Sequence, residues 1–170
     1  MKKIAIYLIS LLSVVVMLGA CTHNKVYATV VVTPDKYSKI SDDKKLIETT
    51  ISELKKFNSE RPDTEKKIID SLDQLIDQGQ KGMSKKDQAE FKDLLGTSSN
   101  GVQGMLTRAY KHQLGFDDDL TGHVRHNMLK AMQLMTHSIT KNKNDQDKIY
   151  KQMLKDTSAN SDLYQIGNDQ

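Results

Sequence analysis

Two histidines and two aspartates lie close enough in the sequence to share a metal ion. His123 and His126 are three residues apart, a spacing that brings two side chains to the same side of a helix. Asp117 and Asp119 precede them in an acidic turn and add carboxylate oxygens. A mixed set of imidazole and carboxylate favours zinc over calcium, because calcium sites take oxygen ligands. The sequence therefore predicts a metal site at Asp117, Asp119, His123 and His126.

The acidic turn also resembles the front half of an EF-hand calcium loop. Counted from Asp117, the first ligand positions fall on Asp117, Asp119 and Thr121, and Gly122 takes the place of the turn glycine. Met128 stands where the motif requires its bidentate glutamate. The missing ligand favours another interpretation, in which the aspartates cap the following helix beside its free amide groups.

The histidines are expected to lie on a polar side of a helix from about Thr121 to Thr140. At about 100° per residue, His123, His126 and His137 fall on one side, with Lys130 among them. A lysine at that position repels a metal cation. The same spacing therefore also predicts histidines that face solvent.

Three methionines lie on the opposite side of this expected helix, at positions 128, 132 and 135. Thioether sulfurs can bind Cu(I) in exported proteins. The same spacing is that of a helix face packed on a core, where methionine commonly fills gaps. Core packing is the interpretation that the periodicity favours.

The only cysteine, Cys21, is a candidate for lipid attachment. It follows two lysines and an unbroken apolar run from Ile4 to Leu18, an order typical of an export signal. The residues Leu18-Gly19-Ala20-Cys21 resemble the lipobox of bacterial lipoproteins. The resemblance implies that the Cys21 thiol carries a diacylglyceryl group and becomes the mature N-terminus, with the two acyl chains that stable anchoring requires.

Other fates of this segment remain open. Val26-Tyr27-Ala28 has the spacing of an ordinary cleavage site, and cleavage after Ala28 would release a secreted soluble helical protein without Cys21. The apolar run is short for a retained membrane span, which needs about 20 residues. The octamer Ser13 to Ala20, SVVVMLGA, resembles the apolar peptides that bacteria release from lipoprotein signals as mating pheromones.

The composition argues against several classes of function. Without the two lysines of the signal, 23 basic residues stand against 22 acidic ones, and no run of five like charges occurs. Nucleic acid is therefore not an expected partner. The chain has no catalytic motif such as G-x-S-x-G or H-E-x-x-H, so we expect neither an enzyme nor a cofactor. The preference for lysine over arginine is typical of low-GC Gram-positive bacteria.

The hydrophobic pattern predicts an all-α fold, an antiparallel bundle of five to six helices after a short N-terminal extended segment. The expected organisation is a signal peptide (1–20), a tether with a short strand (21–40), a helical domain (41–156) and a frayed C-terminal tail (157–170). The strand is expected within VYATVVVT, with Leu163 to Ile166 as its only plausible partner. The helices are expected at about 41–58, 62–79, 84–96, 102–115, 121–140 and 145–156.

Together these features predict a membrane-tethered extracytoplasmic binding or interaction protein at the cell membrane. Its partners would be the membrane, through the lipid anchor, and an unidentified protein or peptide. Immunity to a bacteriocin, exclusion of a phage, or an accessory role at the cell surface fit that location. The alternative from a different class is a metal- or calcium-binding surface lipoprotein.

Overall fold

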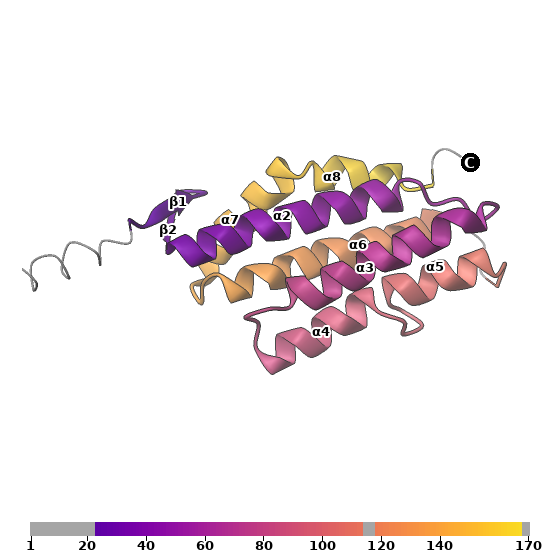
Figure 1. The fold of residues 1–170 in the computed structure, drawn as a ribbon, viewed down its shortest axis with the longest axis horizontal. Coiled ribbons are helices and arrows are strands. Elements are labelled where there is room, and N and C mark those ends of the chain that lie inside the picture. Colours follow the sequence, from indigo (N-terminus) through magenta and orange to yellow (C-terminus); the bar gives the residue numbers. More distant parts are fainter. Residues whose placement is uncertain (1–22, 114–117, 168–170) are drawn as a thin grey trace, which may run out of the picture.

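The computed structural model describes residues 23–113 and 118–167, and every structural statement below refers to them. The signal segment, Cys21 and Asp117 lie outside this part of the chain, as does the pheromone-like octamer. The described residues form a helical bundle with one small hairpin at its end (Figure 1). The prediction of an all-α fold is confirmed.

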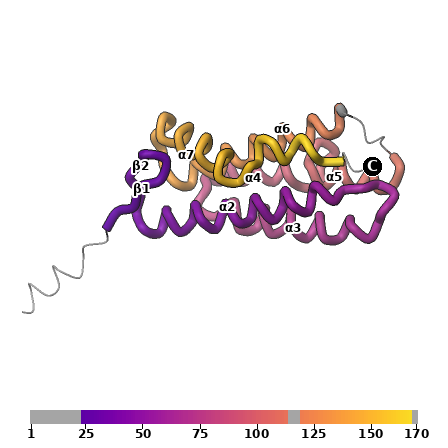
Figure 2. The backbone as a smooth tube through the Cα atoms, turned by 90° about the horizontal axis from the view of Figure 1, so that it is seen from above, coloured from indigo at the N-terminus to yellow at the C-terminus, as the bar shows by residue number. Residues whose placement is uncertain are grey.

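Seven α-helices and three short 3-10 helices make up the bundle in the described residues. The helix α2 packs mainly on α3, α6 packs on α4 and α5, and α8 packs on α2 (Figures 1 and 2). The bounds are α2 Pro34–Leu54, η1 Pro62–Thr64, α3 Glu65–Gly79, α4 Lys85–Leu95, α5 Val102–Tyr110, α6 Asp118–Met135, η2 Thr136–Ser138, α7 Lys143–Asp156, α8 Ala159–Asp162 and η3 Leu163–Gln165.

The N-terminal extended segment pairs with itself. Strand β1 (Lys25–Tyr27) runs antiparallel to β2 (Val30–Val32), and Ala28 and Thr29 connect them with φ angles of 51° and 65°. Two left-handed residues in succession are what a tight hairpin turn of this length requires. The expected pairing with Leu163 to Ile166 is wrong, because a local turn costs far less loop-closure entropy than a partner at the other end of the chain.

The first helix begins earlier than expected. The hydroxyl of Thr33 accepts a hydrogen bond from the Lys36 amide at 3.4 Å, and Pro34 opens α2. Proline fits the first helical position because it lacks the amide that the helix leaves unbonded there. Ser41, where the first helix was expected to begin, lies inside α2. The helical domain therefore starts at 34, and the tether is shorter than expected.

The C-terminal segment packs on the core through residue 166, and the expected frayed tail is wrong to that point. Ala159, Leu163 and Ile166 are all at most 1% exposed. Their spacing of four and then three residues places them on one side of the successive turns α8 and η3. This apolar spacing is readable from the sequence and is the signal that the prediction missed.

The helix α6 supplies much of the core. Val124, Met128, Ala131, Met132 and Met135 are each at most 1% exposed. The prediction that the methionines pack in the core is therefore confirmed. Among the described residues, no helix combines the length and apolar character that crossing a membrane requires.

Candidate functional site

The structure brings two of the four predicted metal ligands together. The Nδ1 atom of His123 lies 3.4 Å from a carboxylate oxygen of Asp119 and 2.9 Å from its carbonyl oxygen. Both side chains are mostly exposed, and so is His126. In the described part of the chain, no three His, Cys, Asp or Glu side chains gather closely enough to hold a metal. Asp117 lies outside that part, so the four-residue site stays a prediction.

The expected histidine side, which the structure divides between α6 and the following η2, partly faces the helix α4. His123 and His126 are exposed as expected, but the Nδ1 atom of half-buried His137 lies 3.4 Å from the Asp87 carboxylate. Burial of Asp87 opposes ionisation, yet hydrogen bonds from Ser84 and His137 outweigh it and lower the pKa of this carboxyl. Lys130 similarly contacts Glu90 at 2.8 Å. Part of this polar side therefore joins two helices.

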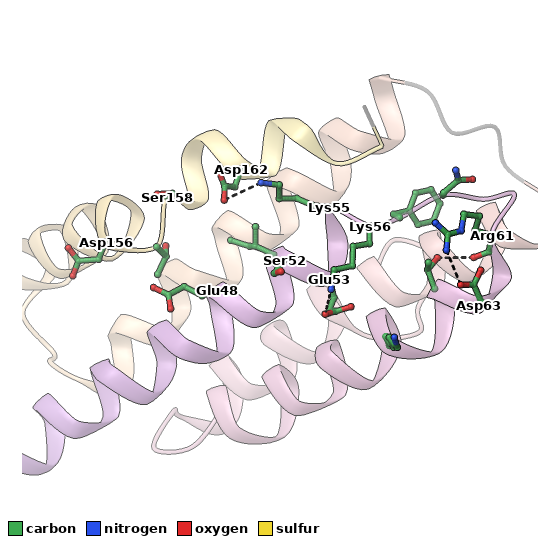
Figure 3. A pocket seen from close by; sticks show the side chains of 16 residues that line it. Glu48, Ser52, Glu53, Lys55, Lys56, Arg61, Asp63, Asp156, Ser158 and Asp162 are labelled. Carbon is green, nitrogen blue, oxygen red and sulfur yellow. Dashed lines mark hydrogen bonds and ion pairs between the residues drawn. The ribbon is translucent and has the colours of Figure 1, made fainter. Parts of the chain in front are cut away.

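A polar cleft with a volume of about 710 Å³ lies between the C-terminal half of α2, the start of α3 and the junction of α7 with α8 (Figure 3). It extends to the connection between α2 and α3, at the end of the bundle opposite the hairpin (Figures 1 and 3). Its lining residues are Glu48, Ile51, Ser52, Glu53, Lys55, Lys56, Phe57, Asn58, Arg61, Asp63, Thr64, Lys67, Asp156, Thr157, Ser158 and Asp162.

The backbone beside the cleft changes direction at Ser158. This residue has φ 52° and ψ 16°, a left-handed conformation between the end of α7 and the start of α8. Ile51, Phe57 and Thr157 form a buried floor, each at most 5% exposed. The Phe57 ring packs edge-on against Tyr110, with 4.9 Å between ring centres. The cleft is thus an open polar surface above a buried and largely apolar base.

Most charges in the cleft are paired with each other. Three ion pairs, all drawn in Figure 3, join Lys55 to Asp162 at 3.6 Å, Lys56 to Glu53 at 2.6 Å and Arg61 to Asp63 at 3.2 Å.

Two charged residues of the cleft are left over. Among the described residues, neither Glu48 on α2 nor Lys67 on α3 has an ion-pair partner, and both are exposed. The cleft therefore offers one uncommitted carboxylate and one uncommitted ammonium group to a ligand.

Asp156, at the hairpin side of the cleft, connects three elements. Its carboxylate accepts hydrogen bonds from the Tyr27 hydroxyl at 2.8 Å, from Lys44 at 2.7 Å and from Gln152 at 2.6 Å. Partial burial opposes ionisation of Asp156, but these donors outweigh it and lower its pKa. The Tyr27 ring also lies edge-on to Tyr37, with 6.5 Å between ring centres. The hairpin is therefore fixed to both α2 and α7.

Comparisons with protein-family models, curated proteins and solved structures give no match for this chain. The evidence for a function therefore comes from the residues and their geometry. Sequence patterns did not predict the cleft, because Glu48 and Lys67 belong to no motif. The fold alone brings them to one surface.

Proposed function

We propose that this chain is an extracytoplasmic lipoprotein, tethered through Cys21, that binds a protein or peptide partner in the polar cleft. The lipobox residues Leu18 to Cys21 supply the proposed anchor. The folded body begins close behind it, since β1 starts at Lys25. The proposed location is the outer face of a Gram-positive cytoplasmic membrane.

The hydrogen bond from Tyr27 to Asp156 is the observation that carries this proposal. Cleavage after Ala28, the route to a secreted form, would cut the hairpin in its turn and remove β1 together with Tyr27. Strand β2 would then lose its partner, and Asp156 would lose one of its donors. Processing at Cys21 leaves all of these contacts in the mature protein, which supports lipidation over secretion.

The position and charges of the cleft support a binding role. It extends to the end of the bundle opposite the hairpin (Figures 1 and 3), so a partner can approach it from the side away from the anchor. The uncommitted carboxylate of Glu48 and ammonium of Lys67 complement a peptide segment that carries both signs of charge. Immunity to a bacteriocin, exclusion of a phage or service to a neighbouring membrane complex are the roles that this arrangement suits.

Complementation of a deletion strain tests the proposal. The strain is scored for bacteriocin tolerance, phage adsorption and conjugation, and we expect a change in one of them that the wild-type chain restores. Lys67→Glu, which reverses the uncommitted cleft charge, should fail to restore it. Lys86→Glu is the matched control, because Lys86 is an exposed lysine at the start of α4, outside the cleft. Equal complementation by both variants, at equal protein levels, would contradict binding in the cleft.

A further inference from the structure

The outer face of the hairpin exposes a pair of valines. Val26 and Val31 lie directly opposite each other across the two strands, and each is 64% exposed. Val30 and Val32, which point the other way, are only 6% exposed. The hairpin therefore has one apolar side packed on the bundle and a second apolar side that no described residue covers.

A third exposed side chain lies at the same end of the bundle. Tyr37, in the second turn of α2, is 41% exposed and adjoins Tyr27 of the hairpin. Of the four large apolar or aromatic side chains exposed in the described residues, three are thus at this end. The fourth, Tyr164, stacks under the Arg125 guanidinium at 3.8 Å. An exposed tyrosine at this end suits a membrane interface, where one end of its ring is apolar and the other is hydrated.

Lysines surround the same end of the bundle. Lys25 and Lys143 are exposed and form no ion pair with a described residue. Lys36 donates to the backbone carbonyl of Ser138 and forms no ion pair with a described residue. Lys141 donates to the carbonyl of His137, but its charge also acts on the Asp87 carboxylate and helps to lower the pKa of that group.

The acidic residues near these lysines do not balance them. Asp35 is an exposed carboxylate in the first turn of α2, whereas Asp145 and Asp147 on α7 are paired with Lys148 and Lys151. Lys25, Lys36 and Lys143 thus surround an apolar tip without an ion-pair partner among the described residues. Three such lysines favour contact with a surface that is apolar and anionic, as a phospholipid bilayer with anionic headgroups is.

The chain length before the hairpin limits where this tip can be. Val26 follows Cys21 by five residues, and an extended chain spans at most about 3.6 Å per residue. The valine backbone therefore lies within about 18 Å of a lipidated Cys21. The contacts of Tyr27 then fix the whole bundle to this short connection.

We propose that the hairpin end is a membrane-contact surface, in which Val26 and Val31 enter the headgroup layer and the surrounding lysines bind anionic phospholipid. This inference rests on the proposed lipid anchor and adds to it a fixed orientation. With the hairpin on the bilayer, the long direction of the bundle points outward and the far part of the cleft stands clear of the lipid (Figure 1).

Site-specific fluorescence on the full-length chain tests this contact. Protein purified from a lipidating bacterial host is reconstituted into vesicles of equal parts phosphatidylglycerol and phosphatidylcholine, with an environment-sensitive label at Val26→Cys or Val31→Cys. Glu60→Cys, in the exposed connection at the opposite end, carries the control label. We expect lipid-borne nitroxide to quench the hairpin labels several-fold more than the control, and aqueous iodide to quench them several-fold less.

Other outcomes overturn the inference. Hairpin labels that respond to both quenchers like the Glu60→Cys label would show a tip in water. Protection from iodide without quenching by the lipid-borne nitroxide would mean that the hairpin packs on a second copy. The mass of the wild-type chain separates failure of the anchor from failure of the contact, because a diacylglyceryl group on Cys21 is present or absent whether or not the hairpin meets lipid.

Variants that change the charge examine the lysines separately. In Lys25→Gln/Lys143→Gln, the lipid quenching of the hairpin labels should fall in vesicles with phosphatidylglycerol and stay unchanged in phosphatidylcholine alone. Lys67 is an uncommitted lysine at the far end of the bundle, and Lys67→Gln should leave the lipid quenching of the hairpin labels unchanged in both kinds of vesicle. Equal effects of the two substitutions would contradict a specific role for the hairpin-end lysines.

Discussion

The hairpin end and the cleft end of this bundle arrange their surface groups in opposite ways. The hairpin exposes Val26 and Val31. Around it, Lys25, Lys36 and Lys143 have no ion-pair partner among the described residues. The cleft is lined by acids and bases that largely pair with each other above the buried floor of Ile51, Phe57 and Thr157. One end therefore suits an apolar, anionic surface, and the other suits a polar partner in water. The same helices thus provide an anchored side and a binding side.

The largest expected difference between the ends is in stability. Phe57 is 2% exposed beneath the cleft, so Phe57→Ala should lower the free energy of unfolding by about 3–5 kcal/mol through lost burial and a residual cavity. Val31→Ala, on the exposed hairpin face, should change it by less than about 0.5 kcal/mol. Urea denaturation of both variants measures the contrast. A comparable loss in the two would mean that Val31 is covered in the free protein.

The second effect concerns a buried carboxyl on the hairpin half of α2. Burial raises the pKa of Asp43 to about 6, although Lys39 at 2.8 Å acts to lower it. Because the pKa of Asp43 is higher in the folded than in the unfolded state, its protonated carboxyl favours folding. This contribution to the free energy of unfolding is complete below about pH 4 and is lost as the pH rises through about 6. The free energy lost is about 2–3 kcal/mol, at 1.36 kcal/mol per pKa unit.

The variant Asp43→Asn isolates this contribution, because its amide does not titrate. When the pH rises from about 4 to about 7, the free energy of unfolding of the variant should increase by about 2–3 kcal/mol relative to that of the wild type. Urea denaturation at several pH values measures this difference. Parallel pH profiles for the two proteins would contradict a raised pKa at Asp43.

A smaller effect is expected where the hairpin meets the cleft. Tyr27→Phe removes the hydrogen bond to Asp156 and should cost about 1 kcal/mol in the free energy of unfolding. The pKa of Asp156 is lower in the folded than in the unfolded state, so its ionised carboxylate stabilises the fold. This stabilisation is present above the pKa of the unfolded state and is lost as the pH falls through the pKa of the folded state. The difference between variant and wild type should therefore shrink below about pH 4.

Tyr150→Phe is the control for this substitution. Tyr150 is a half-buried tyrosine on α7 whose pKa burial raises, and its hydroxyl has no hydrogen-bond partner among the described residues. Its loss should leave stability unchanged at every pH. If Tyr150→Phe costs as much as Tyr27→Phe, the hydroxyl bond does not hold the hairpin.

The smallest expected effect is that of metal. Only Asp119 and His123 of the predicted ligands are in contact in the described residues, so we expect the melting temperature to be the same after chelation and with added zinc or calcium. A real site would add about 2.7 kcal/mol of stability at a hundredfold excess over the dissociation constant. A rise that His123→Ala abolishes, and that His112→Ala leaves in place, would establish the metal site instead.

The sequence predicted the helices well because burial follows a simple period. The apolar spacing through Met128, Met132 and Met135 gave a core face that the structure confirms. It did not predict the hairpin turn, because Ala28 and Thr29 are unusual residues for positive φ and only the fold holds them there. It also did not predict the cleft, whose Glu48 and Lys67 are ordinary surface residues until packing brings their helices together.

Mass spectrometry of the mature N-terminus tests the central claim most directly. Chain extracted from membranes of the native host should begin at Cys21 and carry the mass of a diacylglyceryl group, and Cys21→Ala should abolish that modification. Such a chain keeps β1 and the bond from Tyr27 to Asp156. A soluble product that begins at Thr29 would contradict the lipid anchor, the membrane contact of the hairpin and the orientation of the cleft together.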